Sequence, residues 1–183
     1  MSTEIKTLEL TVPEGVNLNI EKNKLLVSGP KGQVARDFPQ GIEIKAADKK
    51  VHISAIDVNA QTRALVGTYR AHLKNMFDGV QKPFVYKLKV CSTHFPITTT
   101  VSGSEFLISN FLGEKRARKA KIPPGVTVSV SGEIVTVESV NLELAGMTAT
   151  RIEQATRISA KDRRVFQDGI YITEKYGKII GAV

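Results

Sequence analysis

The residues best suited to catalysis or metal binding are few and widely separated in this chain. Its 183 residues include three histidines, His52, His72 and His94, and a single cysteine, Cys91. Zinc binding or general-base catalysis needs a second ligand or a carboxylate at a fixed spacing, which no pair of these histidines provides. Cys91 and His94 could in principle form a nucleophilic dyad, but strand residues three apart point to opposite faces. We therefore expect no catalytic residue, no metal, no cofactor and an unreactive thiol.

Glycine-rich loops of the kind that bind phosphates are also missing from the sequence. It contains no Gly-x-Ser-x-Gly elbow, no Walker loop and no Gly-x-Gly-x-x-Gly fingerprint. The stretch Gly29-Pro30-Lys31-Gly32 has the spacing of the loop by which KH domains clamp a nucleic-acid backbone. That loop joins two helices, whereas the residues on both sides of this stretch are typical of strands. We predict a tight turn with the charge of Lys31 at its tip.

Two clusters of basic residues are the strongest chemical signal. The first lies within seven residues and comprises Lys115, Arg116, Arg118, Lys119 and Lys121. Neighbouring cations repel one another by up to about 1 kcal/mol per close pair in water. Such a run is usually a solvated charged face, but a polyanion that neutralises the cations explains their concentration better.

The second cluster combines cations with aromatic rings. Lys161, Arg163 and Arg164 are followed by Phe166 and Tyr171. Aromatic side chains among basic residues can stack on exposed nucleobases while the cations contact phosphates. For Phe166, a place in the core of a final strand is the better interpretation.

The charge of the chain agrees with a polyanionic partner. Twenty-six Lys and Arg against eighteen Asp and Glu give a net charge of +8, and the pI is near 9.6. Residues 1–80 hold 11 basic and 9 acidic groups, a net charge of +2, whereas residues 81–183 hold 15 and 9, a net charge of +6. We therefore expect the C-terminal half to face nucleic acid or another polyanion.

Composition also restricts the cellular setting. No apolar run approaches the roughly 20 residues that cross a bilayer, and the first ten residues lack the features of a signal peptide. A single cysteine excludes an internal disulfide framework. With 42% hydrophobic residues the chain can bury a core. We expect a cytoplasmic protein with no membrane partner.

The elements that must position these clusters follow an internal repeat. The stretch Val12-Pro13-Glu14-Gly15-Val16 recurs 110 residues later as Ile122-Pro123-Pro124-Gly125-Val126. At the same offset, apolar positions alternate in both copies: Leu18, Ile20, Leu25 and Val27 correspond to Val128, Val130, Val135 and Val137. Each copy is therefore predicted to contain a Pro-x-Gly turn followed by two strands.

A helix is predicted after each hairpin, capped by Asn59 in the first copy and by Asn141 in the second. The apolar stripes are Leu65, Tyr69, Leu73 and Met76, and Leu142, Ala145, Ala149 and Ile152. Further strands are predicted at residues 34–38, 42–46 and 51–56 in the first copy, and 84–90 and 106–111 in the second. We predict an α+β fold of two tandem copies of a small domain, residues 1–80 and 81–183, each an antiparallel sheet with one packed helix.

The second basic cluster lies within a longer motif. Residues 154–175, with the sequence QATRISAKDRRVFQDGIYITEK, resemble the C-terminal motif of the large-subunit ribosomal protein six family, in its archaeal and eukaryotic branch. Residues 110–115 (NFLGEK) resemble the central segment of that family, and residues 27–32 (VSGPKG) its first-domain turn. Bacterial members end in a Tyr-Lys-Gly-Lys-Gly type of segment, which this chain lacks.

This resemblance implies a structural ribosomal protein and not an enzyme. Family members bind large-subunit rRNA, mainly through the C-terminal copy, near the region where translational GTPases dock. The implied RNA contacts are Lys115, Arg116, Arg118, Lys119, Lys121, Lys161, Arg163, Arg164, Tyr171 and Lys175. The implied setting is the cytoplasmic ribosome, one copy per particle, with neighbouring ribosomal proteins as partners. Asp168-Gly169 is expected to form the turn that presents Tyr171.

Two other classes of function remain open. An RNA-processing enzyme could use the same basic surface, but it would need an acid, base or metal cluster that the sequence does not show. A nucleic-acid chaperone without a fixed site would bind unrelated RNAs equally well. The first copy, with a net charge of only +2, is free to meet protein neighbours or passing translation factors.

Overall fold

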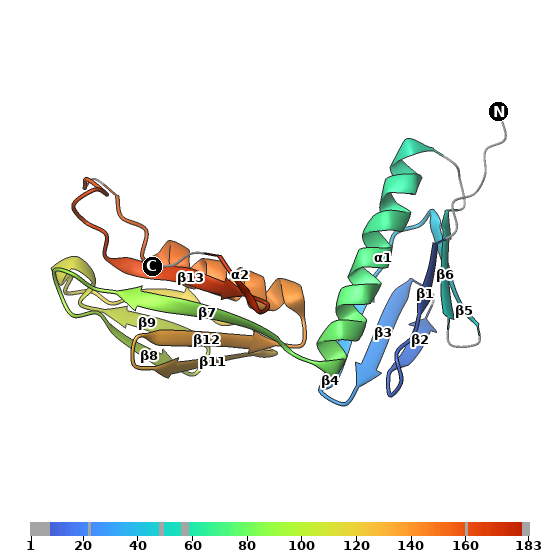
Figure 1. Cartoon of the computed structure of the whole chain (residues 1–183), viewed down its shortest axis with the longest axis horizontal. Helices are drawn as coiled ribbons and strands as arrows, with labels where there is room; N and C mark the ends of the chain where they lie inside the picture. Colours follow the sequence, from blue (N-terminus) through green and yellow to red (C-terminus); the bar gives the residue numbers. More distant parts are fainter. Residues whose placement is uncertain (1–7, 22, 48–49, 56–58, 160, 181–183) are drawn as a thin grey trace. The chain divides into compact units, whose positions relative to one another are not determined.

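The computed structural model describes residues 8–21, 23–47, 50–55, 59–159 and 161–180. Ile56, which the sequence places at the end of a strand, lies outside them. The chain divides into two compact units, residues 1–83 and 84–183 (Figure 1). Each unit carries its own helix and its own antiparallel sheets.

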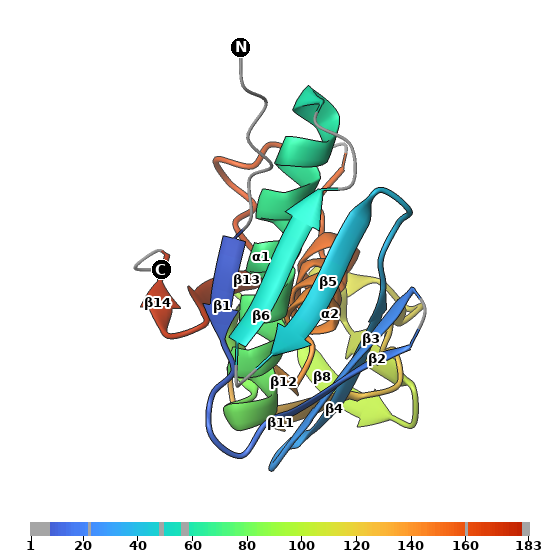
Figure 2. The same ribbon diagram turned by 90° about the vertical axis from the view of Figure 1, so that its right-hand side faces the viewer.

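The first unit packs one helix against short strands. These are β1 (Leu8–Thr11), β2 (Asn17–Glu21), β3 (Lys24–Gly29), β4 (Gly32–Asp37), β5 (Ile42–Ala47) and β6 (Lys50–Ala55). The described strands form two sheets, ordered β1-β6-β5 and β2-β3-β4. Helix α1 (Ala60–Gln81) contacts strands of both, and Figure 2 shows it behind β1, β6 and β5.

Helix α1 begins at the predicted cap. The Asn59 side-chain oxygen accepts a hydrogen bond from the Thr62 N–H at 2.8 Å, and Thr62 Oγ1 accepts one from the Asn59 N–H at 3.1 Å. This reciprocal pairing satisfies backbone donors that the first helical turn leaves open. The cap at Asn59 is therefore confirmed.

The buried face of α1 differs slightly from the predicted stripe. Leu73, a member of the stripe, is fully buried, but Leu65 and Tyr69 are only half-buried. Val66 faces the core in place of Leu65. The apolar period predicted a helix correctly, while the exact face depends on the strands that cover it.

The Gly29–Gly32 stretch is a hairpin turn, as predicted. Gly29 ends β3, Gly32 begins β4, and the two residues pair across the turn. A Cβ at Gly29 would lie 2.8 Å from the Val80 side chain, and the Lys31 N–H donates to the Val80 carbonyl at 3.0 Å. The turn is packed on the C-terminal end of α1, so it lacks the helix-to-helix context of a KH loop.

The second unit has the same plan with more strands. They are β7 (Phe84–Cys91), β8 (Thr98–Ser102), β9 (Glu105–Ser109), β10 (Arg118–Lys121), β11 (Val126–Ser131), β12 (Ile134–Ser139), β13 (Gly169–Lys175) and β14 (Lys178–Ile179). The described strands form a five-stranded sheet, ordered β11-β12-β7-β13-β14, and a three-stranded sheet, ordered β10-β9-β8. Helix α2 (Leu142–Ala155) contacts both, and Asn141 caps it as predicted.

The strand registers confirm the internal repeat. Leu18 of β2 pairs with Val27 of β3, and Val128 of β11 pairs with Val137 of β12. Both members of the second pair lie 110 residues after those of the first. The same hairpin is therefore built twice, which agrees with an α+β fold of two tandem copies.

Two features of the sheets depart from the predicted pattern. Each unit has two sheets among its described residues, where one was predicted. The strand predicted at residues 106–111 ends at Ser109, and Phe111 lies buried in a short 3₁₀ turn, Phe111–Gly113. Alternating apolar residues indicate that a segment is a strand, but they do not specify which strand it pairs with.

The core of the second unit lies between α2 and its two sheets, and β7 of the five-stranded sheet contributes a whole face to it. Phe84, Tyr86, Leu88 and Val90 of β7 all face it and are at most 9% exposed. Their alternation with outward-facing residues is typical of a strand that packs one face on the core. This core fixes β13, which pairs with β7, and the ends of β13 and α2 in turn hold the basic segments.

Candidate nucleic-acid interface

The first basic cluster is divided between two faces of β10. Arg118 and Ala120 point toward the core side, whereas Lys119 and Lys121 are exposed on the opposite side. Lys119 pairs with Glu105 of β9 at 2.8 Å. Lys115 and Arg116 precede the strand in an exposed loop. The cluster is therefore not one continuous surface, because side chains alternate along a strand.

Arg118 connects β10 to the end of α2. Its Nη1 donates to the Ala155 carbonyl at 2.9 Å and to the Arg157 carbonyl at 3.1 Å. Its Nε and Nη2 donate to both carboxylate oxygens of Glu114, at 2.9 and 2.5 Å. The guanidinium carbon also lies 4.3 Å from the centre of the Phe111 ring. These contacts use the planar fork of arginine to join segments almost 40 residues apart.

Glu114 is held ionised by the same contact. Its hydrogen bonds with Arg118 lower the pKa of the Glu114 carboxyl below its ordinary value; desolvation opposes this, and the charges of Arg118 and Lys161 add to the lowering. Glu114 thus pairs with Arg118 of the first cluster and feels the charge of Lys161. Lys161 belongs to the second cluster, so the structure brings both clusters to one end of the unit.

The loop that carries the second cluster, residues 161–168, is fastened through Phe166. The Lys161 ammonium lies 4.6 Å from the centre of the Phe166 ring. The His94 ring lies 4.7 Å from it, tilted by 31°. Phe166 packs against the core while remaining partly exposed, as predicted for a core residue, but it precedes β13 and is not part of a strand.

Asp168 is a buried anchor of this loop, which corrects the expectation of a simple Asp-Gly turn. It is 1% exposed, and its carboxylate accepts hydrogen bonds from the N–H groups of Thr93 and His94 at 2.5 and 2.9 Å. Burial by itself raises the pKa of Asp168, but the hydrogen bonds from His94 and Thr93 outweigh it and hold the pKa below the ordinary value. The charged carboxylate is needed because it accepts several donors at once.

Gly169 starts β13 and makes room for Tyr171. A Cβ at Gly169 would lie 3.0 Å from the Tyr171 ring. The Tyr171 hydroxyl donates to the Gln167 carbonyl at 3.1 Å. Burial raises the pKa of Tyr171 above its ordinary value, while the nearby charge of Arg163 opposes the rise. Gly169 therefore permits a close approach to Tyr171.

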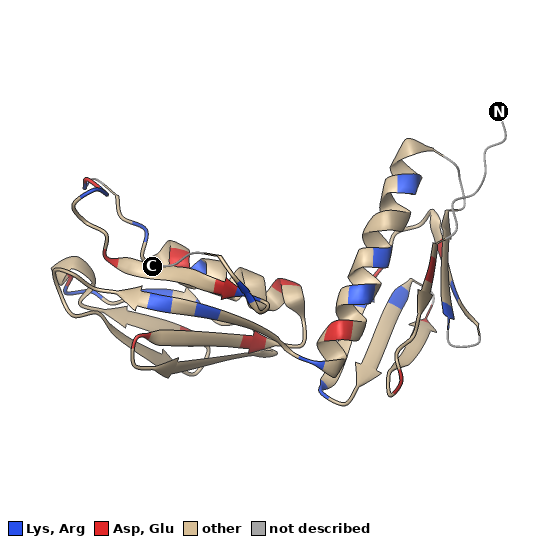
Figure 3. Cartoon of the chain, viewed as in Figure 1, with Lys and Arg blue, Asp and Glu red and all other residues tan. Residues whose placement is uncertain are grey.

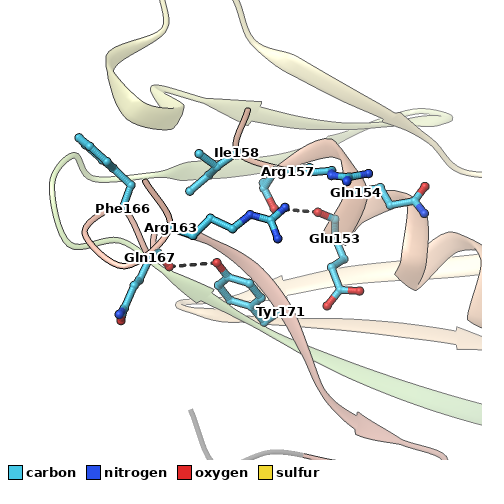
Figure 4. A pocket seen from close by; sticks show the side chains of 9 residues that line it. Glu153, Gln154, Arg157, Ile158, Arg163, Phe166, Gln167 and Tyr171 are labelled. Atoms are coloured by element: carbon cyan, nitrogen blue, oxygen red, sulfur yellow. Dashed lines mark hydrogen bonds between the residues drawn. The ribbon is translucent and has the colours of Figure 1, made fainter. Parts of the chain in front are cut away.

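A pocket of about 280 Å³ opens beside Tyr171. Figure 4 shows Arg163 reaching across it toward the end of α2, above the Tyr171 ring. Gln154 and Arg157 from the end of α2 form the opposite wall. Neither was proposed as a site residue from the sequence, although both belong to the motif at residues 154–175. Their position within that motif is the feature of the sequence that could have identified them as site residues.

The predicted site residues thus fall into separate places. Lys161, Arg163, Arg164, Lys115 and Arg116 are exposed around the end of α2. Among the described residues, the side chains of the two loop arginines and of Lys115 and Arg116 form no ion pair. Lys175 lies at the other end of β13, six residues after Gly169, which corresponds to about 20 Å along a strand. The structure does not bring it to the other cations.

The charge distribution can be followed in Figure 3. Lys and Arg mark the loop before β13 and the middle of β7 in the second unit. In the described part of the chain, no group of three or more His, Cys, Asp and Glu side chains could hold a metal ion. None of the helices described is both long and apolar enough to cross a bilayer. The arrangement offers cations, two aromatic rings and a small pocket.

These features define a tandem α+β protein that presents cations on a rigid framework of sheets. Comparison with known proteins makes the class specific: the family model for Ribosomal protein L6 matches residues 12–83 and 95–169, one segment in each unit. The chain belongs to the ribosomal protein L6 family. It is accordingly a structural ribosomal protein and not an enzyme, as the C-terminal motif predicted.

Individual relatives are similar over nearly the whole chain. The large ribosomal subunit protein uL6 of Aeropyrum pernix is 47% identical over 178 residues, which cover 96% of this chain and 98% of that protein. That of Sulfurisphaera tokodaii is 46% identical over 176 residues, covering 95% and 94%. That of Ignicoccus hospitalis is 47% identical over 167 residues, covering 88% and 90%. These archaeal relatives confirm the predicted branch of the family.

Proposed function

We propose that the chain takes its place in the large subunit of the cytoplasmic ribosome by binding large-subunit rRNA, chiefly through its second unit. Family membership supports a place in the large subunit, and the chemistry of the second unit supports the RNA contact. One copy per ribosome, with ribosomal proteins as neighbours, completes the proposal.

The observation that carries the RNA contact is the linkage made by Arg118. Its bonds to the carbonyls of Ala155 and Arg157 place the loop before β10 next to the end of α2. The exposed cations around this junction form what we call the α2-end surface: Lys115, Arg116, Arg157, Lys161, Arg163 and Arg164. Cations on fixed elements can match the phosphates of a folded RNA, and they release counterions on binding.

Within this proposal, Arg118 acts mainly by positioning. Its guanidinium donates to four acceptors inside the protein, so little of it remains for a phosphate. Lys119, Lys121 and Lys175 are proposed as outlying contacts, because they lie on other faces or at the far end of β13.

For the first unit, we propose contacts with neighbouring ribosomal proteins and with translational GTPases that pass the subunit. Its net charge is only +2, so RNA attraction is weaker there. Lys31 lies exposed at the tip of the β3–β4 turn. Charge reversal of Lys31 and its neighbours is expected to slow factor-dependent GTP hydrolysis on the ribosome; unchanged hydrolysis would count against this assignment.

The RNA contact is tested by titrating the full chain with fragments of large-subunit rRNA across a range of salt, with small-subunit rRNA as competitor. The double variant Arg163→Glu with Arg164→Glu should bind more weakly and with a shallower salt dependence, by about one unit of log–log slope per lost phosphate contact. The matched control is Arg63→Glu with Arg70→Glu, which changes the net charge equally at two exposed arginines of α1 in the first unit.

Each result has a defined meaning. Preference for large-subunit rRNA that is lost in the second-unit variant and kept in the control supports a fixed site at the α2-end surface. Equal losses in both variants would reduce the interaction to overall charge. Equal affinity for the two rRNAs would favour a nucleic-acid chaperone. Loss of an RNA-processing activity on mutation of a carboxylate, with binding intact, would favour an enzyme.

A further inference from the structure

The pocket at the end of α2 is lined by more than charged groups: aromatic, amide and carboxylate side chains also face it. It lies between the C-terminal end of α2, the loop before β13 and the start of β13 (Figure 4). Ile158 and Thr156 form its buried side, whereas Arg157 and Arg163 are exposed at its mouth. A volume of about 280 Å³ is just below the roughly 300–1,000 Å³ of pockets for drug-sized ligands. It suits a single planar ring system.

Two planar groups line this pocket, the Tyr171 ring and the Arg163 guanidinium. The ring is held in place by the protein, whereas the guanidinium is available to a ligand. The Tyr171 ring is held by its hydrogen bond to the Gln167 carbonyl and by close packing on Gly169. The Arg163 guanidinium lies across the pocket near that ring and forms no ion pair with any residue that the structure describes (Figure 4). Proteins stack unpaired nucleobases on aromatic rings and on arginine planes.

Polar groups on the opposite wall could read the edge of a base. The Gln154 side-chain amide offers both donors and an acceptor. Glu153 uses one carboxylate oxygen to accept the Ile172 N–H at 3.1 Å, and its other oxygen has no hydrogen bond to a described residue. A ligand with both donors and acceptors on one edge, as every nucleobase has, matches this wall.

The charge at the mouth of the pocket indicates which chemical group adjoins the planar ring. Arg157 and Arg163 line the mouth, and Lys161 lies on Phe166, which also lines it. These cations favour a phosphate beside the planar group. An acidic peptide would match the charge, but its carboxylates offer no planar ring to stack on Tyr171.

We propose that this pocket binds one nucleobase that an RNA strand turns out of its stack, with the adjoining phosphate at Arg157 and Lys161. This inference rests on the proposed function, since the RNA that supplies the base is large-subunit rRNA. A free nucleotide offers the same chemistry, so the test must separate the two sources. Unstacking a base costs a few kcal/mol, which the contacts in the pocket would offset.

The first arm compares two adjacent arginines in binding to a large-subunit rRNA fragment at low and at high salt. Arg163 lines the pocket and Arg164 does not, yet both are exposed in the same loop and carry the same charge. Arg164→Ala should lose affinity mainly at low salt. Arg163→Ala should lower the affinity by a further fivefold to 150-fold, approximately the range for one stacked base. This additional loss of affinity should persist at high salt.

The second arm tests the ring itself. Tyr171→Phe keeps the aromatic face and should retain most of the affinity, whereas Tyr171→Leu should lose affinity to a similar extent as Arg163→Ala. The third arm titrates the isotope-labelled full chain with AMP, GMP, CMP and UMP, with ribose 5-phosphate as control. Signals of the Gln154 amide and the Tyr171 ring should shift with the nucleotides and not with the control.

The outcomes are distinct. Equal losses in Arg163→Ala and Arg164→Ala that disappear at high salt would overturn the pocket proposal and leave the rRNA proposal intact. A wild-type chain that shows no preference for large-subunit rRNA in the competition with small-subunit rRNA would refute the proposed function. If a chain without that preference still shows nucleotide-induced shifts of the Gln154 and Tyr171 signals, the occupant of the pocket is a free nucleotide. If it shows no such shifts, the pocket proposal is refuted.

Discussion

The Nδ1 atom of His94 lies 2.5 Å from a carboxylate oxygen of Asp168, although the two residues are 74 positions apart in the chain. His94 belongs to the loop after β7 and Asp168 to the loop before β13. Because the His94 ring also lies against Phe166, one buried carboxylate fixes both loops at the end of the second unit. The α2-end surface therefore depends on a residue that does not itself face solvent.

Asp168→Asn is expected to destabilise the second unit at neutral pH by about 1.5–3 kcal/mol, the range for hydrogen bonds to a charged group. Since the pKa of folded Asp168 lies below its ordinary value of 3.8, its contribution is present above that value and is lost as pH falls through the folded value. Urea unfolding at neutral pH and between about pH 4 and pH 2 should show the two proteins converging in acid.

The control for that variant is Asp162→Asn, which changes an exposed carboxylate in the same loop. Among the residues that the structure describes, this carboxylate accepts a hydrogen bond only from the Arg164 N–H. It should cost less than about 1 kcal/mol. Equal stability of Asp168→Asn and the wild type at neutral pH would show that Asp168 does not anchor the loops.

Arg118→Lys should lower stability by about 1–3 kcal/mol and weaken rRNA binding, although the charge is unchanged. A lysine cannot reach Glu114 and the carbonyls of Ala155 and Arg157 with one planar group. Chemical unfolding and hydrogen exchange of the amides after α2 measure the effect. Lys119→Arg is the matched exchange on the outer face of β10, where an exposed ion pair contributes little, and it should leave both properties unchanged.

Two glycines of the first unit should respond to alanine with opposite signs. A Cβ at Gly29 would come within 2.8 Å of Val80, so Gly29→Ala should destabilise the unit by about 1–3 kcal/mol. At Gly67, within α1, a Cβ meets nothing within 4 Å, so Gly67→Ala should stabilise the helix by about 0.5–1 kcal/mol. Thermal unfolding of both variants checks the packing of the β3–β4 turn on α1; destabilisation of the same size in both would contradict it.

Cys91 should react slowly with alkylating agents near neutral pH. Burial raises the pKa of its thiol above the ordinary value of 9.0, and the charges of Glu133 and Asp168 add to the rise while Lys89 opposes it. The thiolate is the reactive form, so the rate of alkylation by iodoacetamide should reach half its maximum above pH 9.0. The same chain unfolded in urea is the control and should react faster at pH values below the midpoint. Equal rates in both states would contradict this effect of burial.

Local pattern was enough to predict much of the fold. The repeat at an offset of 110 residues, the caps at Asn59 and Asn141, and the alternating apolar positions of the two hairpins all appear in the structure. The caps and the alternation each lie within a few neighbouring residues, because local geometry sets them. The repeat was found by comparing two such local patterns. The family assignment likewise rests on a continuous motif at residues 154–175.

Other features of the site could not be predicted in this way. The sequence of the first basic cluster predicts one continuous patch. Side chains alternate along β10, however, so Arg118 points inward and Lys119 points outward. Asp168 resembles a turn residue in the sequence, yet it is buried against His94. Arg157 and Gln154 became candidate site residues only because the structure shows that they line the pocket beside Tyr171.

The sequence by itself determined the class of protein, the duplication and the half that carries the positive charge. Only the tertiary structure decided which cations share a surface and which are used inside the protein. The physical reason is that the deciding contacts, Arg118 with the end of α2 and Asp168 with His94, join residues that are distant along the chain. Such contacts form when the core between α2 and the sheet brings the segments together, and no local pattern encodes them.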